Sequence, residues 1–233
     1  MELTEGIVVK SSDYRDNDKI IYLITNNGKM SLILKSAKKV HSKTFNYSHE
    51  LSKLLFGSSK NYLTTGNVLT NYAYIKTNIN VLKSALIITE ISYELIDHIN
   101  DYKVFYSFLS DVLNMINNGI NNELLEIVFR VKILYLLGVA PVFNKCVDCE
   151  AKNDLVGFSF YDGGMKCILH NNNIDYLYNN DVISQLKGLY LQKIDKINVN
   201  QHIDYQSLDS FLNRYYDTFL GFKSKVKVVF SKI

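Results

Sequence analysis

The chain has 233 residues, 47% of them hydrophobic, and 26 Lys and Arg against 23 Asp and Glu give a net charge of +3. This composition excludes collagen-like, mucin-like and disordered chains, and the length predicts two domains. The three cysteines cannot form a complete disulfide framework, and the chain shows no basic and apolar leader. No apolar run approaches the roughly 20 residues that cross a bilayer, so the sequence predicts a cytoplasmic protein without a membrane segment.

Residues 3–75 contain the features of a small β-barrel. Short β-branched or aromatic runs occupy residues 6–10, 19–24, 30–35 and 68–74, and no long helix interrupts them. The tetrapeptide Asn26-Asn27-Gly28-Lys29 predicts a tight hairpin, because Asn and Gly tolerate positive φ. The pattern favours a closed or partly open barrel, and an SH3-like barrel would give the same signs.

Helical periodicity replaces the strand pattern from about residue 78. Asn80 is the expected N-cap of the first helix. Gly138 and Pro141, the single proline of the chain, are expected to end the third helix. The further helices are predicted at residues 102–117, 122–137, 181–194 and 207–219.

The strongest motif combines Cys146-Val147-Asp148-Cys149 with Cys167-Ile168-Leu169-His170, seventeen residues apart. Two knuckles of this spacing supply four donors to one tetrahedral Zn(II), so we expect one structural ion held by Cys146, Cys149, Cys167 and His170. Free cysteines packed as small hydrophobes and an iron–sulfur cluster are the alternatives. A zinc deaminase is excluded, because no His-x-Glu precedes the cysteines.

Charge is concentrated at the two ends of the chain. Residues 1–80 carry net +5, residues 81–185 net −6 and residues 186–233 net +4, and residues 28–62 alone reach +6. Such a concentration is typical of a polyanion-binding surface, although lysines also protect strand edges and solvate loops.

The segment from Lys35 to Lys43 combines cations with hydroxyl groups after a strand, which suits phosphate contact without base readout. Nearby aromatic residues are candidates for stacking on single-stranded bases or for packing in the barrel: Tyr14, Phe45, Tyr47 and Tyr62. No motif of nucleotide hydrolysis, dinucleotide chemistry, zincin proteolysis or α/β-hydrolase chemistry occurs, so we expect a protein that is not an enzyme.

Several of these segments together resemble the bacterial RecO recombination-mediator family. They are Gly6-Ile7-Val8, Tyr14-Arg15-Asp16-Asn17-Asp18-Lys19-Ile20, Lys35-Ser36-Ala37-Lys38-Lys39, Leu136-Leu137-Gly138-Val139-Ala140-Pro141, the Cys146 and Cys149 knuckle, and Leu220-Gly221-Phe222-Lys223-Ser224. The resemblance implies an α+β fold with an N-terminal OB-fold barrel at residues 1–78. An α-helical domain at residues 79–233 would follow, with a zinc-binding insertion at about 142–176.

The resemblance also implies a function. A protein of this family binds single- and double-stranded DNA, anneals complementary strands and, with RecR, helps load RecA onto DNA covered by single-strand-binding protein. The expected location is the bacterial cytoplasm, where the protein would associate with the nucleoid during repair. Two alternatives remain open: a zinc-containing protein-interaction adaptor, and an RNA-binding OB-fold protein, because phosphate contacts and stacking alone do not distinguish the two nucleic acids.

The site residues follow from the charge pattern. Lys35, Lys38, Lys39 and Lys43 are the expected primary phosphate contacts, supported by Lys29 and Arg15. The acidic C-terminal tail of single-strand-binding protein would meet basic residues in the last third of the chain, and the candidates are Lys187, Lys223, Lys225 and Lys227. The chain departs from the family pattern in two ways: His170 stands where Cys is commoner, and the segment from Lys35 to Lys43 has lysines where arginines are frequent.

Overall fold

The computed structural model describes residues 3–198 and 202–232. The chain forms two compact units: one contains Met1–Asn122 and Ser224–Ile233, and the other contains Glu123–Lys223. The sequence predicts a domain boundary at residue 78 and a zinc-binding insertion at about 142–176, and both stay predictions.

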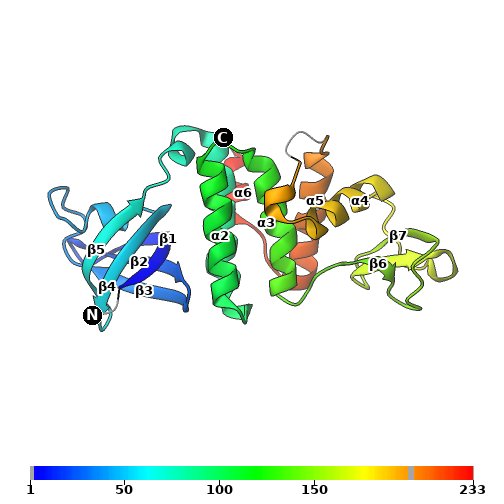
Figure 1. Ribbon diagram of the computed structural model, residues 1–233, viewed down its shortest axis with the longest axis horizontal. Helices are drawn as coiled ribbons and strands as arrows, with labels where there is room; N and C mark the ends of the chain where they lie inside the picture. The colour runs from blue at the N-terminus through cyan, green and yellow to red at the C-terminus, as the bar shows by residue number, and fades with distance from the viewer. Residues whose placement is uncertain (1–2, 199–201, 233) are drawn as a thin grey trace. The chain divides into compact units, whose positions relative to one another are not determined.

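The first unit contains a closed five-stranded barrel (Figure 1). The strands are β1 (Thr4–Tyr14), β2 (Asp18–Thr25), β3 (Gly28–Leu34), β4 (Ser52–Ser59) and β5 (Tyr62–Thr70), in the order β1-β2-β3-β5-β4. β4 pairs with β1 in antiparallel fashion, and β3 pairs with β5 in parallel. The structure therefore confirms the expected OB-fold barrel.

The barrel is stabilised by a core of buried hydrophobic side chains from β1 to β4 and from the loop after β3, against which Leu63 of β5 packs. Its members are Val8, Ile21, Leu23, Leu32, Leu34, Ala37, Leu54 and Phe56, all at most 2% exposed. The β2–β3 hairpin forms where it was expected, and Gly28 has a φ of +101° in its turn.

Two details of the strand prediction were wrong. The expected run at 68–74 is a strand only to Thr70, because Tyr72 adopts a left-handed φ of +47° that a strand does not accommodate. β4 was missed, since Ser52, Lys53 and Gly57 weaken its β signal although its burial alternates as a strand requires.

Helices α1 (Ile79–Leu95) and α2 (Tyr102–Asn117) follow the barrel in the first unit, and the short α6 (Lys225–Phe230) returns to it. The predicted cap at Asn80 was wrong by two residues: the N-cap is Asn78, whose side chain accepts hydrogen bonds from the N–H groups of Asn80 and Val81. Glu90 of α1 accepts hydrogen bonds from Ser224 and from the backbone of Lys225, which attaches α6 to α1.

The second unit contains α3 (Asn122–Leu136), α4 (Asn180–Leu191) and α5 (Tyr205–Leu220). Between α3 and α4 a small sheet has the order β6-β8-β7, formed by Val142–Cys146, Gly164–Cys167 and Leu155–Ser159. Gly138, with a φ of +72°, follows α3 as expected. Short 3₁₀ helices occupy Asn46–Ser48, Tyr74–Thr77, Ile96–His98, Ile168–His170 and Ile194–Lys196.

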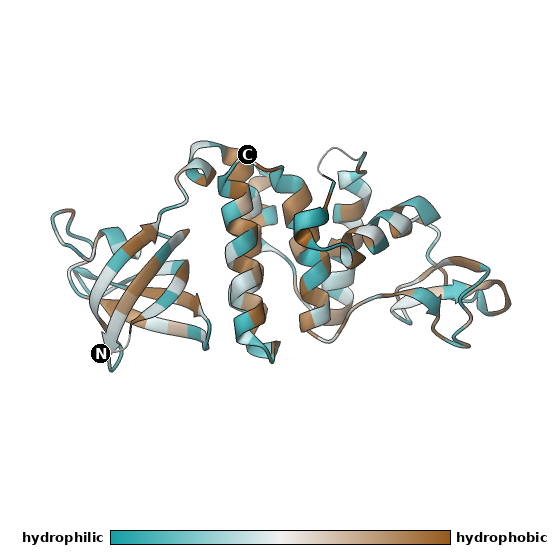
Figure 2. Cartoon of the chain, in the orientation of Figure 1, coloured by the Kyte–Doolittle hydropathy of each residue, from teal (hydrophilic) through white to brown (hydrophobic). Residues whose placement is uncertain are grey.

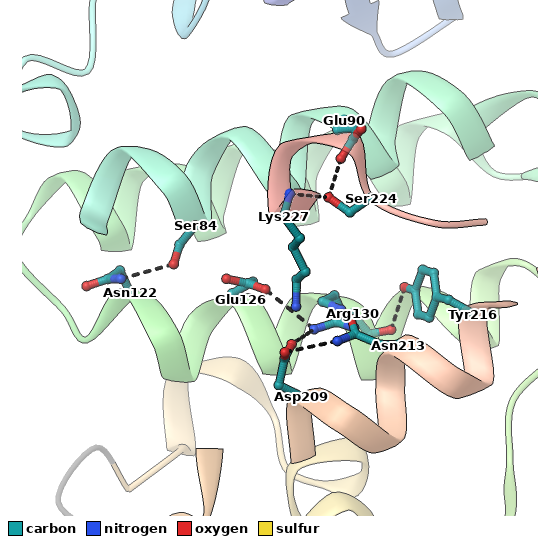
Figure 3. Close-up of polar contacts among 10 residues, drawn as sticks. All are labelled: Ser84, Glu90, Asn122, Glu126, Arg130, Asp209, Asn213, Tyr216, Ser224 and Lys227. Atoms are coloured by element: carbon teal, nitrogen blue, oxygen red, sulfur yellow. Dashed lines mark hydrogen bonds and ion pairs between the residues drawn. The ribbon is translucent and has the colours of Figure 1, made fainter. Parts of the chain in front are cut away.

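Two features hold the second unit together. The rings of Phe158 in β7 and Phe160 in the turn after it pack against Phe211 and Tyr215 of α5, and the ring centroids of Phe158 and Phe211 are 5.0 Å apart. Figure 3 shows Arg130 of α3 facing α5, where its guanidinium contacts Asp209 and Asn213. Helices of both units carry teal and brown residues in Figure 2, as expected for elements with one exposed and one buried face.

Among residues 3–198 and 202–232, no helix combines the length and apolar character needed to span a membrane.

Candidate metal centre and nucleic-acid surface

The second unit gathers the four predicted metal ligands into one cluster. Cys146 ends β6 and Cys149 lies in the turn that follows, while Cys167 ends β8 and His170 ends the adjoining 3₁₀ helix. The ligand atoms of all four residues lie within 4.8 Å of one another.

The spacing of these atoms fits a tetrahedral zinc ion. Zn–S bonds of about 2.3 Å and Zn–N bonds of about 2.0–2.1 Å at tetrahedral angles require S···S separations of about 3.8 Å and S···N separations of about 3.6 Å. Cys149 Sγ lies 3.7 Å from Cys167 Sγ, and Cys167 Sγ lies 3.4 Å from His170 Nδ1. A disulfide would need an S–S distance of about 2.0 Å, so this cluster has metal-site geometry.

The surrounding backbone favours the thiolate form at one ligand. Burial of the Cys146 thiol raises its pKa, but backbone N–H donors at Cys149, Asp148 and Cys167 outweigh that effect and bring the pKa to about 6. A thiolate is the form that binds metal. Because four protein donors fill a tetrahedron and leave no open position, the cluster is suited to a structural role.

The six predicted DNA contacts all lie on the barrel or its loops, but two of them, Lys29 and Lys38, already pair with carboxylates. Lys29 Nζ is 2.5 Å from Asp97 Oδ2 of the segment after α1 and lies over the Tyr93 ring at 4.9 Å. Lys38 Nζ is 3.1 Å from Asp13 Oδ2 and donates to the backbone carbonyl of Arg15.

Arg15 lies in the β1–β2 turn, where its guanidinium stacks 4.9 Å from the ring centroid of Tyr14. Lys35 follows β3, and its ammonium lies 5.0 Å from the ring centroid of Tyr62, the first residue of β5. Each pair combines a cation with a partly exposed ring, which is the combination that holds a phosphate and stacks on a base.

Lys39 and Lys43 are exposed in the loop between β3 and β4, and among the described residues neither ammonium has a carboxylate partner. Lys60 has the same character but was not among the predicted contacts. It lies in the β4–β5 turn beside Asn61, whose carbonyl accepts a hydrogen bond from Ile33 where β3 meets β5. The sequence signal for Lys60 is its place in the basic segment 28–62.

Two of the four candidate stacking residues pack against other parts of the first unit. Tyr47 packs against the barrel core and donates its hydroxyl to the Gly66 carbonyl at 2.6 Å, and Phe45 packs edge-on against His49. Tyr14 and Tyr62 therefore remain the better placed rings.

The four candidate lysines for an acidic partner tail divide between the units. Lys187 and Lys223 belong to the second unit, where Lys223 pairs with Asp217 at 3.0 Å, and Lys225 and Lys227 belong to α6 of the first.

The chain thus combines a five-stranded OB-type barrel with a helical part into which a small sheet with a closed Cys3His cluster is inserted. The OB-type barrel is a fold that commonly binds oligonucleotides, so the chain has the architecture of a nucleic-acid-binding protein. The chain belongs to the recombination protein O family: the family model described as "Recombination protein O N terminal" matches residues 1–74, and the one described as "Recombination protein O C terminal" matches residues 77–227. The resemblance noted from the sequence is confirmed.

Named relatives agree with this assignment. The chain is similar to the DNA repair protein RecO of Bacillus cytotoxicus, with 26% identity over 93% of this chain and 91% of the relative. It is similar to the DNA repair protein RecO of Bacillus mycoides, with 25% identity over 96% of this chain and 94% of the relative. The protein of the same name from Bacillus cereus strain AH187 is 26% identical over 93% and 91%.

Proposed function

We propose that this protein is a DNA repair and recombination mediator that has no catalytic activity of its own. Family membership and the names of its relatives support the repair and recombination role. The observation that carries the proposal is the set of exposed cations on an OB-type barrel, Lys39, Lys43 and Lys60, together with the Lys35–Tyr62 pair.

Binding would proceed through the phosphate backbone. Ammonium groups neutralise phosphates and release counterions, while Tyr62 and Tyr14 offer rings on which unpaired bases stack. Lys38, Lys29 and Arg15 would contribute after exchanging their present partners for phosphate. None of these groups reads a base edge, so single- and double-stranded DNA of any sequence are the expected ligands.

Annealing follows from the same chemistry. When lysines screen the backbone of two strands and leave the Watson–Crick edges unoccupied, complementary bases are free to pair. We further propose that the protein acts with RecR to help load RecA onto DNA covered by single-strand-binding protein, in the bacterial cytoplasm and at the nucleoid. The acidic tail of that protein would bind Lys187, Lys223, Lys225 or Lys227, where charge favours it.

The Cys3His cluster would hold one structural Zn(II). The bound ion would stabilise the small sheet of the second unit, whose strands are only four or five residues long. Elemental analysis of freshly purified, reduced protein is expected to give one zinc per chain. Absence of zinc from that sample would overturn the assignment of Cys146, Cys149, Cys167 and His170.

One experiment tests the nucleic-acid assignment. Unlabelled single-stranded DNA, duplex DNA and RNA of equal length compete for the protein against a labelled single strand, and a strand-annealing assay is run on the same preparation. We expect both DNA forms to compete and annealing to accelerate. Dominant competition by RNA would favour an RNA-binding protein, and weak binding of every competitor would favour an interaction adaptor; either result would overturn the proposal.

A further inference from the structure

A charged cluster that contains no metal ligand lies beside the Cys3His site. The Lys166 side chain is only 1% exposed, and its Nζ lies 2.7 Å from Asp148 Oδ2 and 2.9 Å from Asp162 Oδ2. Burying an ammonium group costs free energy unless it is paired with an opposite charge, so Lys166 needs both carboxylates in order to be buried at this position.

The three residues come from the segments that carry the ligands. Asp148 lies between Cys146 and Cys149 in the first knuckle, and Lys166 directly precedes Cys167 in β8. Asp162 lies in the turn between β7 and β8, where Ser159 Oγ donates to its carboxylate at 2.8 Å. One side chain thus connects the first knuckle, the turn and the strand that leads to the second knuckle.

A backbone hydrogen bond and a close glycine contact also hold the first knuckle against β8. The N–H of Val147, next to Asp148, donates to the carbonyl of Met165 at 3.0 Å, so a backbone hydrogen bond also joins the first knuckle to β8 beside the Lys166 ion pair. Gly164 allows this approach, because a Cβ there would lie 2.5 Å from Val147 Cγ1. The knuckle is held against β8 by groups that leave the four donor atoms free for metal.

The positive charge of Lys166 also offsets the negative charge around the proposed metal site. Three thiolates and one Zn(II) would carry a net charge of −1, and the carboxylates of Asp148 and Asp162 lie next to them. Without Lys166 the two carboxylates would repel each other and the cluster, and the first knuckle would lose its contact with β8.

We propose that Lys166 is a positioning residue for zinc: it arranges the first knuckle before the metal binds and thereby sets the affinity for zinc and the rate of zinc loss. This inference rests on the proposed zinc site. Residues that orient metal ligands from outside the coordination shell contribute about 10–100-fold to metal affinity, which gives the expected size of the effect.

The test compares two lysines of the same small sheet in the full chain. Lys166→Met removes the buried ammonium, and Lys145→Met removes an exposed ammonium that pairs with Glu150. Zinc affinity is measured by competition with a chromophoric chelator, and Co(II) absorption reports whether the site stays tetrahedral. We expect a loss of about 10-fold or more for Lys166→Met and less than about twofold for Lys145→Met.

A purely structural role of Lys166 gives a different result. It would lower the unfolding midpoints of the zinc-free and zinc-loaded protein equally, and zinc affinity would not change. An unchanged affinity in Lys166→Met, with wild type binding one zinc, would overturn this inference alone. A wild type that binds no zinc would overturn the zinc site itself.

A second variant covers the case in which Lys166→Met does not fold. Asp148→Asn weakens the contact to the first knuckle but leaves Lys166 paired with Asp162, and Asp148 is 34% exposed, so folding is expected to persist. We expect about three- to tenfold weaker zinc binding and faster zinc loss. Binding and release equal to wild type in this variant would overturn the proposal.

Discussion

The clearest test of the nucleic-acid surface uses the difference between free and paired lysines. The double variant Lys39→Ala/Lys43→Ala removes two exposed ammonium groups that have no carboxylate partner within the described chain. The matched variant Lys29→Ala/Lys38→Ala removes the same formal charge, but these two lysines already pair with Asp97 and Asp13.

The expected magnitude follows from counterion release. Each phosphate contact on a single strand contributes about 0.7 to the slope of log affinity against log salt, so two contacts contribute about 1.4. Between about 50 and about 200 mM salt this slope changes the affinity ratio of wild type and variant by about sevenfold. Lys29 and Lys38 must first leave a carboxylate, so their double variant is expected to change the slope by less than about 0.7.

Fluorescence anisotropy with a labelled oligothymidylate, repeated across a salt series, measures both slopes. Circular dichroism and thermal unfolding check that each variant keeps its barrel. Equal slope changes in the two variants would show that the ion pairs of Lys29 and Lys38 do not limit their availability. An unchanged slope in Lys39→Ala/Lys43→Ala would refute the assignment of this loop as the binding surface.

Three further predictions concern stability and pH. Arg130→Met removes a buried guanidinium that pairs with the carboxylates of Glu126 and Asp209, so urea unfolding is expected to show a loss of about 3–5 kcal/mol, and a loss below about 1 kcal/mol would contradict a stabilising buried ion pair. Phe158→Ala removes a fully buried ring between the small sheet and α5 and is expected to cost about 3–5 kcal/mol, whereas Tyr161→Ala, 83% exposed, should change unfolding by less than about 0.5 kcal/mol. Burial raises the pKa of Tyr72 to about 12, so the stability it contributes is present below about pH 10 and is lost as pH rises toward 12, at about 1.4 kcal/mol per pH unit. Tyr72→Phe should reduce the decline in unfolding free energy over that range, and an identical decline in both proteins would show that Tyr72 is not the titrating group.

The sequence predicted the parts of the fold that depend on local patterns. The Asn26-Asn27-Gly28 turn forms because Gly28 accepts the positive φ that the hairpin needs. The helix at 102–117 has the predicted bounds, since its apolar spacing and its Asp101 cap are both local signals. β4 lacked such a signal, because its serines, lysine and glycine acquire strand geometry from pairing with β1 and β5.

The metal ligands could also be predicted from the sequence, because each short knuckle brings two donors close together whatever surrounds it. The role of Lys166 could not be predicted from the sequence. Its ammonium is buried between two carboxylates that lie 18 and 4 residues away in the chain, and no spacing rule relates them. Only the folded sheet brings Lys166 to a position where it connects the Cys146 and Cys149 knuckle to the strand that leads to Cys167 and His170.

The same distinction applies to the basic surface. Composition and spacing by themselves determined that the barrel carries an excess of positive charge and that three cysteines and a histidine form one site. Tertiary structure decided which charges are available: Lys29 is paired with a residue 68 positions away in the chain, while Lys39 and Lys43 project from a loop. An ion pair depends on the distance between charges in space, and the chain order of the residues does not contain that distance.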